Sequence, residues 1–151
     1  MKKLYALILI FVLLFSFQNV HAQNEITVTI NGYFVMFDVP PQIINGRTMV
    51  PMRIIFESLG ANVDWVGEEN LVVATYKTNI ITMPIGEMSF SVIDVLTNET
   101  RVVELDVAPT IIDGRTLVPA RAVSEAIGKT VNWDNDTRTV IITDEASVEN
   151  E

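Results

Sequence analysis

Apolar and polar residues alternate over short stretches along most of the chain, which is the pattern of half-buried β-strands and not of long helices. Turn signals rich in Gly, Asn, Asp and Pro separate these stretches every eight to twelve residues or so, as in all-β and α+β domains. This pattern predicts eight strands, over residues 26–30, 33–37, 63–65, 71–76, 80–84, 89–95, 101–105 and 138–143.

One stretch of the sequence occurs twice. Residues 41–65 align with residues 109–133 at a constant offset, since 115 − 47 = 68 for one pair of arginines and 133 − 65 = 68 for the tryptophans. Thirteen of the 25 aligned positions are identical. Such self-similarity indicates one supersecondary unit per copy, and two copies are too few for a solenoid. We therefore expect two units that share one core.

Each copy of the repeat begins with a predicted hairpin. The turn pairs Asn45-Gly46 and Asp113-Gly114 tolerate the positive φ angles of a type I′ turn, and apolar residues flank both pairs. Pro51 and Pro119 follow, and they suit the first position of a helix because proline lacks the N–H that would be unpaired there. The order hairpin and then helix is therefore expected in both copies.

A short helix is predicted after each proline. Apolar residues recur there at helical spacing. They are Met52, Ile55, Phe56 and Leu59 in the first copy, and Ala120, Val123 and Ile127 in the second. Gly60 and Gly128 stand where a left-handed residue ends a helix. Helices of roughly nine residues do not persist alone in water, so each must pack on a sheet. The predicted fold class is α+β, with duplicated hairpin–short helix–strand units and mainly antiparallel strands wrapped around two short helices.

The N-terminus has the three parts of a secretory signal peptide. Lys2 and Lys3 precede an uncharged apolar run over residues 4–17, and Ala22 is a small residue at the expected cleavage site. A membrane anchor is the alternative, but the run of 17 − 4 + 1 = 14 residues is short against the about 20 that a span needs. We favour a signal peptide over residues 1–22, with cleavage after Ala22 and a secreted, extracellular or cell-surface location after Sec-type export.

The remaining chain is expected to form one domain. Residues 23–144 would contain the two repeats, at about 26–76 and 94–143, with no low-complexity linker between them. Residues 145–151 are short, acidic and without periodicity, and they are predicted to be disordered.

Composition narrows the possible functions. The formal net charge of −9 becomes −11 once Lys2 and Lys3 are removed, which disfavours binding to nucleic acid. The chain has no cysteine, and its single histidine, His21, lies in the predicted signal peptide. Ser-His-Asp and Cys-His catalysis and imidazole-bound copper or zinc are therefore excluded from the mature chain. We expect neither an enzyme nor a cofactor.

Both copies carry the motif Gly-Arg-Thr-x-Val-Pro-x-Arg, followed by Glu-x-x-Gly and then Val-x-Trp. This pair of motifs resembles the copper amine oxidase N-terminal-like domain, also called the stalk domain, and the resemblance covers about residues 26–143. It implies a small α+β module on secreted or surface proteins of bacteria, often beside other modules. In the amine oxidases the copper and the tyrosine-derived quinone belong to another domain, so the resemblance implies an accessory role.

The most conspicuous charges of the repeat are two arginines and one glutamate per copy. They are Arg47, Arg53 and Glu57 in the first copy, and Arg115, Arg121 and Glu125 in the second. The arginines could form a twofold anion site for carboxylate or phosphate. Alternatively, each glutamate pairs with the arginine four residues earlier or with the hairpin arginine, and so holds the helix to a strand. We favour the structural interpretation, since both copies keep the whole set.

Trp65 and Trp133 end their units at equivalent positions. If they are exposed, they could stack on sugar rings or bind a peptide. If they are buried, they close the two halves, and each indole N–H needs a partner. We expect a core or half-core position for both rings.

Two further chemical possibilities are weak. The run Asp134-Asn135-Asp136 could begin a calcium loop, but the glycine and the glutamate that such a loop needs are missing, so an Asx turn is favoured. Paired carboxylates could hydrolyse a glycosidic bond, but most acids lie at predicted turns, and Glu57 and Glu125 have arginines nearby. No metal site and no catalytic residue is therefore expected.

The expected function is a secreted or cell-envelope, non-catalytic module that acts as a structural spacer or as a protein- or wall-interaction domain. The alternative is an accessory ligand-binding subunit of a cell-wall hydrolase or another exported enzyme. The partner would be another exported protein or a cell-wall polymer, not nucleic acid, with membrane contact only through the signal peptide. Self-association through open strand edges is a third possibility.

Overall fold

The computed structural model describes residues 25–144, which form three β-sheets and two short α-helices. Sheet A has the order β12 (Lys129–Asp134), β13 (Thr139–Asp144), β1 (Thr27–Ile30) and β2 (Tyr33–Phe34). Sheet B has the order β10 (Thr110–Ile112), β11 (Arg115–Pro119), β4 (Arg47–Pro51) and β3 (Gln42–Ile44). Sheet C has the order β5 (Asn62–Val66), β6 (Leu71–Tyr76), β7 (Asn79–Pro84), β8 (Ser89–Asp94) and β9 (Glu99–Glu104).

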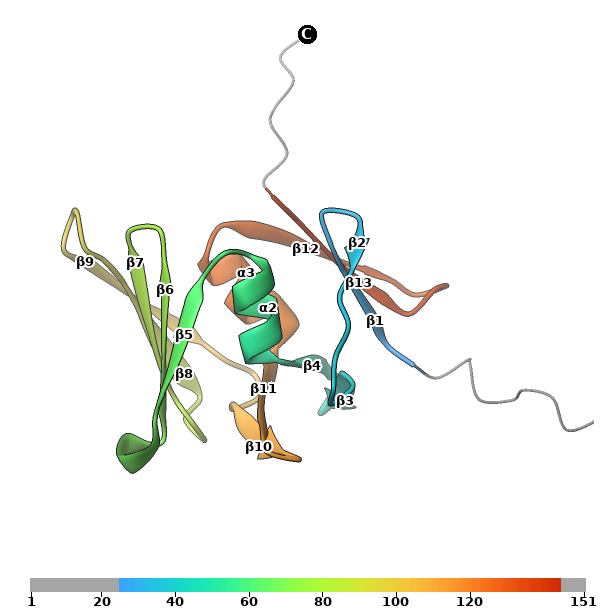
Figure 1. Cartoon of the computed structure of the whole chain (residues 1–151), viewed down its shortest axis with the longest axis horizontal. Coiled ribbons are helices and arrows are strands. Elements are labelled where there is room, and N and C mark those ends of the chain that lie inside the picture. The colour runs from blue at the N-terminus through green and yellow to red at the C-terminus, as the bar shows by residue number, and fades with distance from the viewer. Residues whose placement is uncertain (1–24, 145–151) are drawn as a thin grey trace, which may run out of the picture.

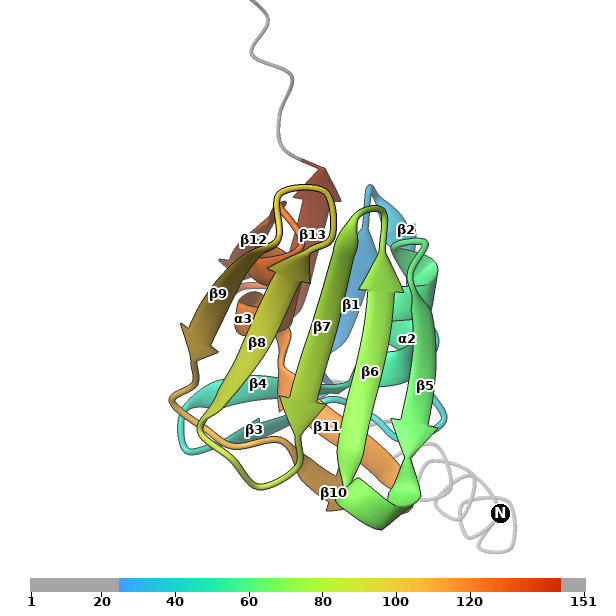
Figure 2. The same ribbon diagram turned by 90° about the vertical axis from the view of Figure 1, so that its left-hand side faces the viewer.

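The two helices, α2 (Met52–Ser58) and α3 (Ala120–Ala126), lie between sheets A and C, and the hairpins of sheet B lie at one end (Figure 1). Seen from the side of sheet C, the five strands of that sheet cover both helices (Figure 2). Nearly all strand pairs are antiparallel, so the predicted α+β class with mainly antiparallel strands is confirmed. The exception within residues 25–144 is β1, which pairs in parallel with β13 and so joins the first and last strands.

The predicted elements differ from the observed ones mainly in length. The strand expected over residues 33–37 is reduced to two residues, because Val35 and Phe37 turn inward and pack against the core. Each helix has seven residues, where about nine were expected. Pro51 and Pro119 are not the first helical residues as predicted. Their ψ angles of 109° and 117° are extended, so each proline ends a strand and caps the helix that follows.

The two copies of the repeated stretch have the same order of elements. The order is β3, β4, α2 and β5 in residues 42–66, and β10, β11, α3 and β12 in residues 110–134. The turn residues Asn45 and Asp113 have φ angles of 48° and 49°, as the predicted type I′ hairpins require. A short 3₁₀ helix, η1 (Gly67–Glu69), follows β5.

The domain has two halves, each of which contains one copy of the repeated stretch. Strands β4 and β11 join these halves in the middle of sheet B. Val50 lies opposite Val118, and these positions are 118 − 50 = 68 residues apart. The neighbouring pairs, Met49 with Pro119 and Leu117 with Pro51, are arranged symmetrically about this one. Both valines are fully buried, so the contact between the halves is part of the core.

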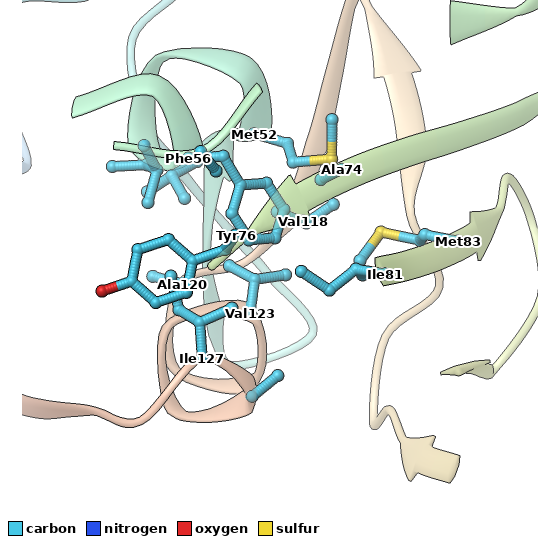
Figure 3. Close-up of a cluster of buried hydrophobic side chains, with 14 of the residues drawn as sticks. Met52, Phe56, Ala74, Tyr76, Ile81, Met83, Val118, Ala120, Val123 and Ile127 are labelled. Carbon is cyan, nitrogen blue, oxygen red and sulfur yellow. The ribbon is translucent and has the colours of Figure 1, made fainter. Parts of the chain in front are cut away.

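The main core is formed by the inner faces of the helices and of sheets A and C. Phe56 and Met52 of α2 meet Val123 of α3 and Ile127, the residue after α3, there. Ile81, Met83 and Tyr76 reach them from sheet C (Figure 3). The apolar stripe predicted along each helix is thus the buried face. A second, smaller cluster consists of Val39, Met49, Val107 and Leu117. It contains two pairs of residues 68 apart, which again come from both halves.

Some predictions concern residues outside the described part of the chain. The segment predicted to be a signal peptide, residues 1–22, and the tail predicted to be disordered, residues 145–151, both lie outside residues 25–144. Within the described residues, neither helix has the length or the apolar character needed to span a bilayer.

Candidate binding grooves

The hairpin arginines form ion pairs that cross between the two halves. Arg47 of β4 donates through Nε to Oδ2 of Asp106 at 2.6 Å, and Arg115 of β11 donates through Nε to Oδ2 of Asp38 at 2.7 Å. In both pairs the Nη2 group contacts the same oxygen. Hydrogen bonding to Arg115 holds the pKa of Asp38 below its ordinary value of 3.8. Each pair has the same geometry, so the hairpin of one half is fixed to the loop before the other hairpin.

The two helix arginines, Arg53 and Arg121, differ in their hydrogen bonds. Arg53 Nη1 donates to Glu57 Oε1 at 3.2 Å and to the Val63 carbonyl at 2.6 Å, so it ties α2 to β5. Arg121 Nε lies 3.8 Å from Glu125 Oε1, which is beyond hydrogen-bonding distance. The second copy therefore leaves its helix arginine with more free donor capacity than the first.

The two tryptophans lie in different environments. Trp133 is half-buried and packs against the main core. Trp65 is 42% exposed, so the expectation of a core or half-core position is wrong for this ring. Its indole lies against Gly67, where an added Cβ atom would come within 3.2 Å of Nε1. The ring thus rests on the turn after β5 and is not inserted between the sheets.

Two surface grooves contain these side chains, and we name each after the helix at its side. The α2 groove has a volume of about 640 Å³, and its walls include Asp38, Arg53, Asp64, Trp65, Ile111 and Arg115. The α3 groove has a volume of about 670 Å³, and its walls include Ile43, Arg47, Asp106, Arg121, Asn132 and Trp133. Every residue of the first set has its counterpart 68 positions away in the second. Each groove lies between the hairpin of one half and the helix of the other half.

The two grooves differ in charge. Asp64 in the α2 groove corresponds to the neutral Asn132 in the α3 groove. The α3 groove also contains Arg101 and Arg138, where the first half has Tyr33 and Asn70. The Nη2 group of Arg101 donates to the Ala126 carbonyl at 2.7 Å, at the end of α3. The α3 groove is therefore the more cationic of the two.

The turn before β13 is an Asx turn, as expected from the sequence. Oδ1 of Asp134 accepts hydrogen bonds from the backbone N–H groups of Asp136 at 2.9 Å and Thr137 at 3.3 Å. Hydrogen bonds from Thr137 also lower the pKa of Asp134. Within residues 25–144, no cluster of three or more His, Cys, Asp or Glu side chains could hold a metal ion.

Several residues of the grooves were not singled out in the sequence, among them Asp38, Arg101, Asp106 and Arg138. A signal for the aspartates was present. Asp38 and Asp106 are 106 − 38 = 68 residues apart, and each is followed by Val-x-Pro, so the repeat extends three residues further upstream than the aligned stretch. No such signal marks Arg101 and Arg138, because the other half has different residues at these positions.

The three sheets, the two short helices and the paired grooves define a small α+β domain built around one main core. A family model described as the copper amine oxidase N-terminal domain matches residues 29–142. The match spans most of the chain, so the protein belongs to this family, as the resemblance indicated. The domain that gives the family its name is a non-catalytic part of those oxidases. No curated protein matches the chain.

Proposed function

We propose that the protein is an exported, non-catalytic module that acts as a rigid spacer or interaction domain in the cell envelope. The observation that carries the proposal is the reciprocal pairing of Arg47 with Asp106 and of Arg115 with Asp38. These pairs use the hairpin arginines to fix the two halves to each other. Side chains used in this way stabilise one arrangement of the two halves, which suits a module that positions other molecules.

The proposal includes a duplicated architecture. Two copies of one hairpin–helix–strand unit, each with the Gly-Arg-Thr-x-Val-Pro-x-Arg motif, would have arisen from a single ancestral unit. The identical order of elements and the symmetric pairing of β4 with β11 support this origin. In such a pair the motif residues stabilise the contact between the copies.

Export depends on the N-terminal segment. The proposal is that residues 1–22 direct Sec-type secretion and are removed after Ala22. Expression of the full chain in a bacterial host, followed by N-terminal sequencing of protein from the medium, tests this step directly. A sequence starting at Gln23 is expected, whereas an intact N-terminus on membrane-bound protein would contradict it.

The non-catalytic assignment is tested with the purified exported protein. We expect no amine oxidation and no hydrolysis of cell-wall polysaccharide above a buffer control. Turnover that copurifies with the protein through successive columns, and that is lost with it on thermal unfolding, would overturn the assignment.

A second candidate function is that of an accessory ligand-binding subunit of an exported enzyme, such as a cell-wall hydrolase. The cationic α3 groove favours it, because Arg121 is not hydrogen-bonded to Glu125. Sedimentation of the protein with isolated cell wall measures binding, and Arg121→Gln should weaken it. The matched control is Arg53→Gln in the α2 groove. Equal binding by both variants would exclude a ligand site in the α3 groove.

A further inference from the structure

The α3 groove lies between the free edges of two sheets. Strand β9 is the last strand of sheet C, and β12 is the last strand of sheet A. Arg101 and Val103 of β9 line the groove from one side, and Asn132 and Trp133 of β12 line it from the other. In Figure 2 helix α3 lies behind strands β8 and β9 of sheet C. The groove is thus a channel between strand edges with a helix at its base.

One side of β9 has no strand partner within the described residues. Strand β9 pairs with β8, and Leu105 N donates to the Met88 carbonyl at 2.8 Å just beyond the ladder. In an antiparallel pair, alternate residues direct their N–H and C=O groups toward the partner. By this alternation Thr100, Val102 and Glu104 direct theirs away from β8. An extended chain placed there would find a row of unpaired backbone groups.

The base of the groove is made of small side chains. Ala120, Ala122 and Ala126 line it, and the corresponding residues in α2 are Met52, Ile54 and Ser58. The side chains that α3 presents to its groove are shorter than those of α2, although the volumes of the two grooves, about 670 and 640 Å³, are similar. The α3 groove can therefore accept a segment with side chains of its own.

Positive charge is concentrated in this groove. Residues 25–144 contain eight Lys and Arg side chains, since ten minus Lys2 and Lys3 leaves eight. Four of the eight line the α3 groove: Arg47, Arg101, Arg121 and Arg138. The groove walls hold three carboxylates, so the walls carry a net positive charge, whereas the same part of the chain as a whole is acidic. In the α2 groove, two arginines are balanced by two aspartates.

Two of these arginines have donors that are still free. The Nε of Arg138 is buried and has no hydrogen-bond partner among residues 25–144. Arg121 is 3.8 Å from the nearest glutamate oxygen. A buried donor without a partner is unfavourable by about 1–3 kcal/mol in proteins generally. An incoming carboxylate would supply an acceptor for Arg121 at the groove surface, and for the Arg138 Nε where binding uncovers that atom.

We propose that the α3 groove binds an extended acidic peptide segment of a partner protein, which adds to β9 as a further strand. The free strand edge recognises the backbone of such a peptide, and the arginines recognise its carboxylates. Side chains of an extended peptide alternate in direction, so every second residue can face the arginines. The inference rests on the proposed interaction role and assigns it a surface and a ligand class.

The first test measures binding of a fluorescein-labelled peptide, Val-Glu-Val-Glu-Val-Glu-Val, to the purified protein by fluorescence anisotropy. The control peptide has Gln in place of Glu. We expect the Glu peptide to bind at least about tenfold more tightly, because charge-assisted hydrogen bonds to arginine are lost with Gln. Equal affinities for the two peptides would overturn the assignment of an acidic ligand.

Protein variants locate the site. Arg121→Gln combined with Arg138→Asn should weaken binding of the Glu peptide by at least about tenfold. Asparagine is chosen because Asn70 stands at the corresponding position with a φ of 49°, close to the 52° of Arg138. The matched control, Arg53→Gln in the α2 groove, should bind as the wild type does. Loss of affinity in the control alone would place the site in the α2 groove and refute the proposal.

N-methylated peptides test strand addition without changing the protein. Two series of peptides are compared, one methylated on the backbone nitrogens of the odd-numbered residues and one on those of the even-numbered residues. Each series lacks every second N–H. One series should lose binding and the other should keep it, because only one edge of an added strand pairs with β9. If both series bind equally, or if the soluble acidic polysaccharide alginate binds more tightly than the peptide, strand addition is refuted. Such a result would leave the proposed spacer role standing, since that role is tested by the N-terminal sequencing and the turnover assays above.

Discussion

Arg47 on β4 forms an ion pair with Asp106, a residue 59 positions later in the chain that lies in the loop before the second hairpin. The pair of Arg115 with Asp38 has the same geometry at positions shifted by 68. Together the two pairs flank the β4–β11 contact, where Val50 meets Val118. The contact between the halves thus has an apolar centre and two charged flanks. The contribution of an ion pair to this contact can therefore be tested by charge reversal.

Reversal of one charge should destabilise the contact between the halves, and reversal of both should restore it. Asp38→Arg places two guanidinium groups together, so we expect the melting temperature to fall. Asp38→Arg combined with Arg115→Asp recreates the pair in the opposite sense, and most of the loss should be recovered. Thermal unfolding followed by circular dichroism measures both variants. The four side chains are 48–67% exposed, so 1 M NaCl should reduce the differences. A double variant no more stable than the single one would show that the pair does not form.

Acid should weaken the fold through carboxylates that are hydrogen-bonded when ionised. Arg115 lowers the pKa of Asp38, and Lys129 lowers the pKa of Asp144, each below the ordinary 3.8. A group with a lowered folded pKa stabilises the fold above its unfolded pKa, and that stability is lost as the pH falls through the folded pKa. The free energy of unfolding should therefore decrease as the pH falls from about 4 toward the folded values. Urea unfolding at pH 6, 4 and 3 measures the effect.

Asp38→Asn provides the control for the acid effect. The variant should be less stable than the wild type at pH 6, where Asp38 is ionised and paired. The difference between the two should shrink at pH 3, because the carboxyl of the unfolded wild-type chain, with its ordinary pKa of 3.8, is then largely protonated, whereas the pKa of the folded chain's Asp38 is lower. A constant difference at all three pH values would assign the acid sensitivity to other groups.

Much of the fold follows from local patterns in the sequence. The type I′ turns at Asn45 and Asp113, the apolar stripes of both helices and the terminating Gly60 and Gly128 are all as predicted. These features depend on φ angles and side-chain spacing within a few residues. The parallel pairing of β1 with β13 was not predicted, since it joins strands more than 100 residues apart. No local pattern specifies such a partner.

The candidate site was predictable only in part. The arginines, glutamates and tryptophans of the repeat do line the two grooves, or lie beside them, but only some of their partners were foreseen. The glutamates were expected to pair either with the arginine four residues earlier or with the hairpin arginine. Glu57 pairs with Arg53, the first of these alternatives, and the chain brings Arg47 to Asp106 of the other half. The exposure of Trp65 was also missed, because equivalent positions were assumed to have equivalent surroundings. Strands β7, β8 and β9 follow β6 before the second copy, whereas β13 is the last strand of the described residues, so the surroundings of the two copies differ.

The two tryptophans should therefore differ in their contribution to stability. Trp133→Ala removes a half-buried ring from the main core, and we expect a loss of about 2–3 kcal/mol, less than the 3–5 of a fully buried ring. Trp65→Ala removes a ring that is 42% exposed, and the loss should be about 1 kcal/mol or less. Urea unfolding measures both, and the remaining tryptophan reports by fluorescence in each variant. Equal losses would show that Trp65 is more buried in solution than in the structure.

Ser124 offers a substitution that should stabilise the protein. Its side chain is fully buried in α3, and its Oγ has no hydrogen-bond partner among residues 25–144. The corresponding residue in α2 is the fully buried Phe56, so this position faces apolar surroundings in both helices. Ser124→Ala removes an unpaired hydroxyl and improves helix propensity, and we expect a gain of about 1 kcal/mol in urea unfolding. The control Ser58→Ala, at an exposed site in α2, changes only helix propensity and should gain less. A loss of stability on Ser124→Ala would mean that the hydroxyl is hydrogen-bonded in solution.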